Sequence, residues 1–112
     1  ALLAWHTLVW AAAALAHAAA ALSDPGAVPA AAKPPAEVCD PRFCDFCPGQ
    51  PWKPARAHHC RVCNRCVFLR HHHCNIVRNC VGFANRKLFI LFHVYAAAAL
   101  TSSLLLLAAA AA

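Results

Sequence analysis

The sequence has few charged residues, and its two ends have none. Charged residues make up 12% of the 112 residues, with four Asp and Glu against ten Lys and Arg, whereas 62% are hydrophobic. This composition is too apolar and too poor in charge for an ordinary small soluble domain, and it excludes intrinsic disorder. All charged side chains lie between residues 23 and 87. The length allows one domain at most, and because the first residue is not Met, we expect a piece of a longer chain.

Residues 1–22 lack Asp, Glu, Lys and Arg, and they also lack Gly and Pro. As a helix, these 22 residues would extend about 33 Å, enough to cross a hydrocarbon core of about 30 Å. A secretory signal peptide would need a basic start and an apolar stretch of only about 7–15 residues, and the segment has neither. An Ala-rich buried helix is the alternative. The residues favour a transmembrane helix that ends at the turn-forming sequence Ser23-Asp24-Pro25-Gly26.

Residues 88–112 form a second segment without formal charge, and we expect a second transmembrane helix there. The histidines of the two apolar segments have no Cys, Asp or Glu in their own segments. We therefore expect His6, His17 and His93 to be neutral side chains packed between helices.

The charged middle of the chain divides into two parts. Residues 23–38 are rich in Ala and Pro and are expected to be a linker, whereas residues 39–87 contain every Cys. Cytosolic loops of membrane proteins carry the excess of Lys and Arg, so this region is expected to face the cytosol. Reducing conditions there disfavour disulfides and favour metal binding or catalysis by the cysteines.

The Cys-rich region contains repeated Cys-x2-Cys pairs, the spacing at which two thiolates can bind one tetrahedral zinc ion. A region this short and this poor in core residues needs the metal in order to fold. Two zinc ions would use eight ligands. Between residues 44 and 80 the sequence offers seven Cys and five His: Cys44, Cys47, Cys60, Cys63, Cys66, Cys74, Cys80, His58, His59, His71, His72 and His73.

Spacing leaves two ligand partitions open. The sequential partition resembles an all-cysteine zinc ribbon, with one ion bound by Cys44, Cys47, Cys60 and Cys63. In the interleaved partition each ion takes three Cys and one His, namely Cys44, Cys47, His59 and Cys66 for the first, and Cys60, Cys63, His73 and Cys80 for the second. The interleaved partition leaves Cys74 free beside histidines, as a candidate nucleophile. Alternatively, Cys74 is a zinc ligand and His73 is not.

Residues 44–89 resemble the Cys-rich domain of the DHHC protein S-acyltransferases. The resemblance rests on Lys53-Pro54-x-Arg56, His59-Cys60-x2-Cys63-x2-Cys66, the four-residue signature ending in Cys74, Asn79-Cys80-Val81-Gly82 and Asn85-x3-Phe89. It implies the interleaved partition and a cytosolic position between membrane helices. The expected fold is therefore an α-helical multi-pass membrane protein fragment, in which transmembrane helices 1–22 and 88–112 flank a small two-zinc Cys-rich domain with short strands.

The resemblance also implies a function, namely protein-cysteine S-acylation. The Cys74 thiolate would attack palmitoyl-CoA or another long-chain acyl-CoA, and the acyl group would pass to cysteines of substrate proteins near the membrane. His72 would be the base, and the residue before it, here His71, would orient His72. An integral membrane protein of the Golgi, the endoplasmic reticulum or the plasma membrane is expected, with the lipid bilayer as a partner.

The signature departs from the family pattern at its first position, where His71 replaces an Asp. A neutral imidazole can accept a hydrogen bond from His72 but supplies no negative charge. The family also has Pro-Trp where this chain has Asn75-Ile76, and two extra residues lie between Cys47 and Lys53. A catalytically impaired family member is therefore an alternative function.

Two further function classes compete with the acyltransferase. A non-enzymatic, membrane-tethered zinc interaction module of the RING-like kind would use all of its cysteines as ligands, which makes the state of Cys74 the discriminating feature. Nucleic-acid binding is disfavoured, because flanking membrane helices account for the basic loop and no recognition helix follows the ligand spacing.

Overall fold

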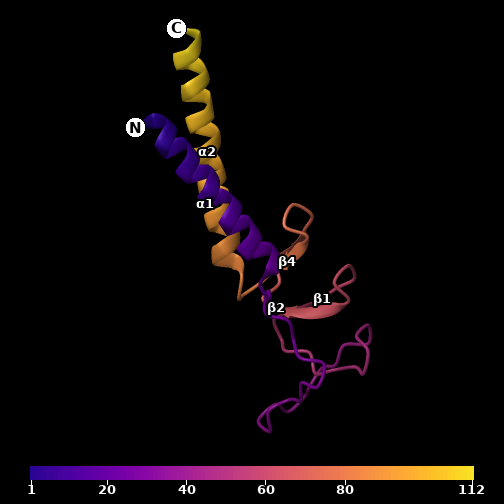
Figure 1. Cartoon of the computed structure of the whole chain (residues 1–112). Coiled ribbons are helices and arrows are strands. Elements are labelled where there is room, and N and C mark those ends of the chain that lie inside the picture. The colour runs from indigo at the N-terminus through magenta and orange to yellow at the C-terminus, as the bar shows by residue number, and fades with distance from the viewer. The chain divides into compact units, whose positions relative to one another are not determined.

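The computed structural model describes all 112 residues, which form two compact units. One unit consists of Ala1–Leu22 and Lys87–Ala112, and the other consists of Ser23–Arg86. The first unit is helical, and the second contains four short strands (Figure 1). Apolar helices that flank a Cys-rich region with short strands were expected from the sequence, and this part of the fold is confirmed.

The first unit contains α1 (Leu2–Leu22) and, from its second residue onward, α2 (Arg86–Ala111). Both are rich in Ala and Leu, which favour helices, and neither contains Gly or Pro. The helix α2 begins two residues before the apolar segment 88–112, so that it includes the charged residues Arg86 and Lys87. Both helices are long and apolar enough to cross a membrane by length and composition, and only 17% and 11% of their most apolar windows are buried.

The two helices contact each other through polar, aromatic and small residues. His6 Nδ1 lies 2.9 Å from Ser102 Oγ, and the rings of His17 and Phe92 meet edge to face at 5.1 Å. The buried positions of α1 follow helical spacing and are all small or β-branched: Val9, Ala13, Ala16 and Ala20. Small side chains let helices approach closely.

His93 departs from the expectation that it packs between the helices. Its side chain is exposed, and Nδ1 lies 2.8 Å from the carbonyl oxygen of Phe89, one turn earlier on α2. The ring contacts Phe89 and Phe92 of the same helix. Residues three and four apart share a helix face, so the local helix provides the contacts that were expected from a neighbouring one.

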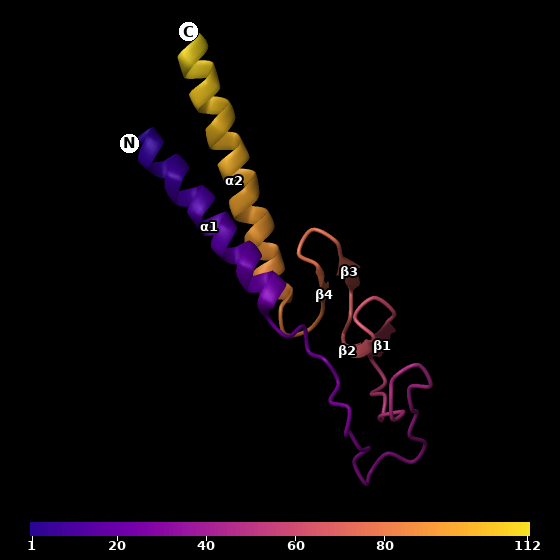
Figure 2. The same ribbon diagram turned by 45° about the vertical axis from the view of Figure 1, so that its right-hand side comes forward.

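The second unit is built from two antiparallel hairpins, drawn side by side with their turns in Figure 2. In the first hairpin, β1 (Ala57–Cys60) pairs with β2 (Arg65–Phe68); in the second, β3 (His72–Cys74) pairs with β4 (Asn79–Val81). The turn before β2 places Asn64 at φ +52, a left-handed conformation that Asn tolerates better than most residues.

Part of the segment expected to be a linker is ordered against β2. The amide of Val28 donates a 2.8 Å hydrogen bond to the carbonyl of Cys66, and the amide of Phe68 donates one of 2.8 Å to the carbonyl of Gly26. Residues 26–28 thus cover the outer edge of the first hairpin, which protects an otherwise unpaired strand edge.

Cysteines outnumber aliphatic residues among the buried side chains of the second unit. Its fully buried side chains are mainly small, with Val67, Val77 and Val81 the largest apolar ones, and the remaining buried positions are mostly cysteines. Such a core contributes little hydrophobic free energy. A unit with so small an apolar core is expected to depend on bound metal for its stability.

Candidate metal centres and active site

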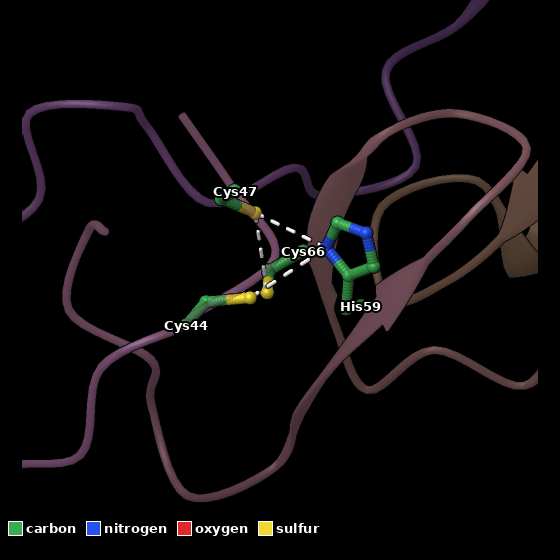
Figure 3. Close-up of side chains that lie close together, drawn as sticks. All are labelled: Cys44, Cys47, His59 and Cys66. Carbon is green, nitrogen blue, oxygen red and sulfur yellow. Dashed lines mark hydrogen bonds between the residues drawn. The ribbon is translucent and has the colours of Figure 1, made fainter. Parts of the chain in front are cut away.

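The first cluster brings together Cys44, Cys47, His59 and Cys66, whose ligand atoms all lie within 4.8 Å of one another. Figure 3 shows the three sulfurs facing Nδ1 of the His59 ring. The distances to Nδ1 are 3.6 Å from Cys44 Sγ and 3.2 Å from Cys47 Sγ, and the two sulfurs of Cys47 and Cys66 are 3.8 Å apart.

The second cluster brings together Cys60, Cys63, His73 and Cys80 in the same way. Their sulfurs lie 3.7, 3.4 and 3.8 Å from His73 Nδ1, and the sulfurs of Cys63 and Cys80 are 3.7 Å apart. His73 and Cys80 are directly opposite each other on β3 and β4, and His59 and Cys66 are opposite each other on β1 and β2. Each hairpin therefore supplies one cross-strand pair of ligand atoms.

These separations fit zinc. A tetrahedral ion with Zn–S bonds of about 2.3 Å and Zn–N bonds of about 2.0–2.1 Å has sulfur–sulfur edges of about 3.8 Å and sulfur–nitrogen edges of about 3.6 Å. The distances within both clusters lie close to these edges. All eight cysteines are free thiols, so no disulfide competes for the sulfurs. The donor set of three Cys and one His in each cluster is typical of structural zinc.

Strand geometry explains why the ligands interleave. His59 and Cys60 are consecutive on β1, and successive side chains of a strand point to opposite faces. One residue therefore reaches the first cluster and the next reaches the second. A sequential partition would place Cys60 with Cys44 and Cys47, whereas β1 directs Cys60 to the face opposite His59, where it joins Cys63, His73 and Cys80.

Without metal, the sulfurs of each cluster differ in acidity. Burial, together with the neighbouring sulfurs, raises the pKa of Cys66 and of Cys80 to about 12. Burial also disfavours the Cys60 thiolate, but the amide of Cys63 and the thiol of Cys80 outweigh it and lower the pKa of Cys60 to about 6. Closely packed thiolates repel one another, so a cation is needed before all three can ionise.

Arg70 is a neighbour of the second cluster that the sequence did not indicate. A hydrogen bond to the Cys80 sulfur, reinforced by the negative charge of Cys80 and Cys60, raises the pKa of this guanidinium above its usual value. Three thiolates around a divalent cation leave net negative charge, and the fixed charge of Arg70 offsets part of it. Only the fold brings Arg70 to this cluster.

Cys74 belongs to neither cluster and is buried, with 7% of its surface exposed. It is the last residue of β3 and lies opposite Asn79 of β4. Because alternate residues of a strand share a face, Cys74 and His72 are on one face of β3 and His73 is on the other. The three residues of β3 thus divide between its two faces. His73 faces the second metal cluster, and the candidate catalytic residues His72 and Cys74 are on the other face.

His71 and His72 form a close pair. Their Nδ1 atoms are 2.8 Å apart, and the rings meet edge to face with centroids 5.0 Å apart. A hydrogen bond of this kind needs one protonated and one unprotonated nitrogen. If Nδ1 of His72 donates and Nδ1 of His71 accepts, the lone pair of His72 is on Nε2.

The loop after β4 holds the end of the β3–β4 hairpin. The buried Asn85 accepts a 2.9 Å hydrogen bond from the Gly82 amide through Oδ1 and donates one of 2.8 Å to the Cys80 carbonyl through Nδ2. Asn79 donates a 2.8 Å hydrogen bond to the Ser23 carbonyl. These amides satisfy buried backbone groups that would otherwise be costly.

Comparison with known proteins identifies similar sequences. Residues 37–112 match the family model of the DHHC palmitoyltransferases. Probable protein S-acyltransferase 15 of Arabidopsis thaliana is 45% identical over 83 residues, which cover 67% of this chain and 32% of the relative. Palmitoyltransferase ZDHHC15 of Xenopus laevis is 54% identical over 55 residues, covering 49% of this chain and 16% of the relative.

Palmitoyltransferase ZDHHC2 of Homo sapiens is 53% identical over 55 residues, covering 49% of this chain and 14% of the relative. The chain thus spans about a third or less of the length of these relatives. The family match covers more than half of the chain and includes both clusters, the Cys74 strand and α2. The chain therefore belongs to the DHHC palmitoyltransferase family.

Proposed function

We propose that the protein to which this chain belongs is a protein-cysteine S-acyltransferase with Cys74 as its nucleophile. The observation that carries the proposal is the division of donors. Eight Cys and His side chains form two complete four-donor clusters, and Cys74 is left outside both. A RING-like interaction module would have no reason to keep this cysteine free beside a paired histidine.

The proposed metal ligands are the residues of the two clusters, and the metal is zinc. When bound, zinc supplies structural stabilisation by holding the two hairpins in place. The proposed catalytic set consists of Cys74, His72 and His71. His71 acts through His72 and is therefore a positioning residue.

In the proposed first step, Cys74 transfers its thiol proton to Nε2 of His72, and the thiolate attacks the carbonyl carbon of a long-chain acyl-CoA. A new carbon–sulfur bond forms to Cys74 and the thioester bond to CoA breaks, so that CoA leaves as a thiolate and takes up a proton. In the second step a cysteine thiolate of a substrate protein attacks the acyl-Cys74 thioester and Cys74 is regenerated. Both steps exchange one thioester for another and need no oxidant or reductant.

We further propose that α1 and α2 cross a lipid bilayer. Their large apolar side chains point outward, as Leu15 and Leu104 illustrate with 72% and 67% of their surfaces exposed. Exposed apolar side chains along a whole helix suit a lipid environment and are unfavourable in water. The excess of Lys and Arg in residues 23–87 favours a cytosolic location of the Cys-rich unit, in the Golgi, the endoplasmic reticulum or the plasma membrane.

One observation favours a second candidate function, a catalytically impaired family member. In a serine triad, loss of the carboxylate that orients the catalytic His lowers turnover by about 10⁴. His71 supplies no such charge. Cysteine depends less on its base than serine does, because part of the thiol is already ionised near neutral pH, so we expect weak but measurable acylation.

The test uses the full-length protein, purified in detergent with zinc bound and incubated with palmitoyl-CoA. Acyl groups on the protein are released with hydroxylamine at neutral pH and quantified. We expect a hydroxylamine-sensitive acyl group that is lost in Cys74→Ser and retained in Cys39→Ser, a control that changes an exposed cysteine outside both clusters. Equal labelling of the Cys74→Ser protein and the unchanged protein would refute the assignment of the nucleophile.

A further inference from the structure

An open polar cavity of about 400 Å³ lies beside the His71–His72 pair. Its lining includes Arg56, His58, Arg70, His71 and Arg86. None of the four acidic residues of the chain contributes to the lining. Three guanidinium groups around a cavity without a carboxylate create a positive potential that attracts anions.

Arg70, one of the lining residues, also carries an unsatisfied polar atom. The buried Nε of Arg70 makes no hydrogen bond, although a buried N–H normally has an acceptor. The guanidinium of Arg70 is shared between the cavity and the second cluster, so Arg56 and Arg86 are the cations that remain for a ligand. Planar guanidinium groups suit tetrahedral oxyanions such as phosphate, which they bind through paired hydrogen bonds.

His71 connects the cavity to the proposed base. Its Nδ1 is engaged with Nδ1 of His72 at 2.8 Å, which leaves Nε2 on the other side of the ring for the occupant of the cavity. An anion there would accept a hydrogen bond from Nε2–H of His71. A neutral imidazole carries one proton, so this contact makes Nδ1 of His71 the acceptor and requires Nδ1 of His72 to be the donor.

We propose that a phosphate group binds in this cavity and takes the place of the missing signature carboxylate, by fixing His71 in the Nε2–H form and His72 in the Nδ1–H form. The anion supplies the negative charge that His71 lacks. It contacts His71, so its charge is separated from His72 by the His71 ring. The proposal deepens the proposed function and rests on it. The phosphate group could belong to free inorganic phosphate, to the acyl donor or to a lipid headgroup, and the test separates these sources.

The first arm of the test measures binding without relying on activity. The full-length, zinc-loaded protein, labelled with ¹⁵N-histidine in neutral detergent, is titrated with inorganic phosphate. We expect saturable changes in the ring nitrogen shifts of His71 and His72, ending with His72 protonated on Nδ1 and unprotonated on Nε2. Arg56→Gln and Arg86→Gln should each weaken binding about tenfold, whereas Arg61→Gln, which changes an arginine outside the cavity, should not.

The second arm measures acylation of Cys74 with a palmitoyl thioester that carries no phosphate. Added phosphate should accelerate the unchanged protein by at least about tenfold and leave His71→Asp unaffected, because that variant has its own carboxylate. Palmitoyl-CoA without added phosphate should match the accelerated rate if the acyl donor is the source. Vesicles of phosphatidylinositol phosphate should do so, and neutral vesicles should not, if the source is a lipid.

The outcomes are separable. Absence of acylation in both the unchanged protein and His71→Asp would refute the proposed function, while the nitrogen shifts would still decide whether an anion fixes the histidine pair. The further inference is overturned if phosphate leaves the shifts of His71 and His72 unchanged, or if Arg61→Gln weakens binding as much as Arg56→Gln. It is also overturned if phosphate binds but acylation by the active protein does not depend on it.

Discussion

His59 and Cys60 are consecutive residues of β1, and their side chains enter different metal clusters. Because successive side chains of β1 point to opposite faces, this one strand supplies a ligand to each cluster. Each cluster also has a cross-strand pair of ligands of its own. Loss of a ligand from one cluster is therefore expected to leave the ligands of the other cluster in place. The exception is a change that distorts β1, the strand that both clusters share.

The first prediction concerns zinc stoichiometry. Cys66→Ala removes a ligand of the first cluster and Cys80→Ala one of the second, and each is expected to lower bound zinc from two ions per chain to about one. Elemental analysis of the purified full-length protein measures this. Cys74→Ala and Cys39→Ser are the controls and should retain both ions. Loss of an ion from Cys74→Ala, with another cysteine left free, would mean that Cys74 is a ligand.

The second prediction concerns the effect of pH on zinc affinity. Without metal, the pKa values of Cys66 and Cys80 are about 12, so both are thiols at neutral pH and must lose a proton when zinc binds. Zinc affinity at each cluster should therefore rise with pH, by at least about tenfold per unit between pH 6 and 8.

Competition with a chromophoric chelator measures the affinity, and calorimetry in buffers of different ionisation enthalpy counts the protons. At the second cluster the dependence should steepen below pH 6, because the pKa of Cys60 is about 6 and its thiolate then competes with a proton as well. An affinity that does not change between pH 6 and 8 would contradict the raised pKa values.

The third prediction concerns His71. Replacing it with Asp restores a carboxylate next to His72, and we expect the rate of Cys74 self-acylation from a palmitoyl thioester without phosphate to rise about tenfold or more. His71→Ala removes the partner of the 2.8 Å contact with His72 and should lower the rate. Single-turnover measurements on zinc-loaded protein give both values. If Asp and Ala at this position give the same rate, His71 does not orient the base.

The fourth prediction concerns Gly82, which lies against the segment that covers β2. A Cβ at this position would collide with the backbone carbonyl of Pro25 and with Cγ1 of Val67, and a backbone atom cannot rotate away. Gly82→Ala should therefore destabilise the protein by about 1–3 kcal/mol, the usual cost of overpacking. Thermal unfolding of the zinc-loaded protein measures the loss.

Gly49→Ala is the comparison for Gly82. A Cβ at Gly49 meets no atom within 4 Å, but the residue has φ +76, so its substitution costs only backbone strain of about 1 kcal/mol. A Gly82→Ala protein that is as stable as the unchanged one would show that residues 25–28 do not pack against the loop after β4.

Several features followed from the residues without a fold. Uninterrupted runs of uncharged residues predict helices of membrane length, because helix propensity and the absence of Gly and Pro act locally. The Cys-x2-Cys spacings predict a zinc site, and this signal is also local, because the two ligands are only three residues apart. The signature ending in Cys74 indicated the chemistry through its resemblance to the DHHC family.

Other features depended on which segments meet in space. Spacing left the sequential and interleaved partitions open, and the pairing of β1 with β2 and of β3 with β4 brings the interleaved sets together. Residues 26–28 lie in the segment 23–38, which composition predicted to be a linker, yet their backbone pairs with β2. Composition reports side chains, whereas strand pairing is decided by backbone groups that every residue has.

The amino-acid sequence by itself determined the apolar ends and the metal-binding character of the middle, because each is carried by neighbouring residues. Its resemblance to the DHHC family indicated Cys74 as the candidate nucleophile. Only the tertiary structure decided the register of the hairpins, the place of Arg70 beside the second cluster and the cationic cavity next to His71. These last features join residues far apart in the chain, and no local pattern encodes the distance between them.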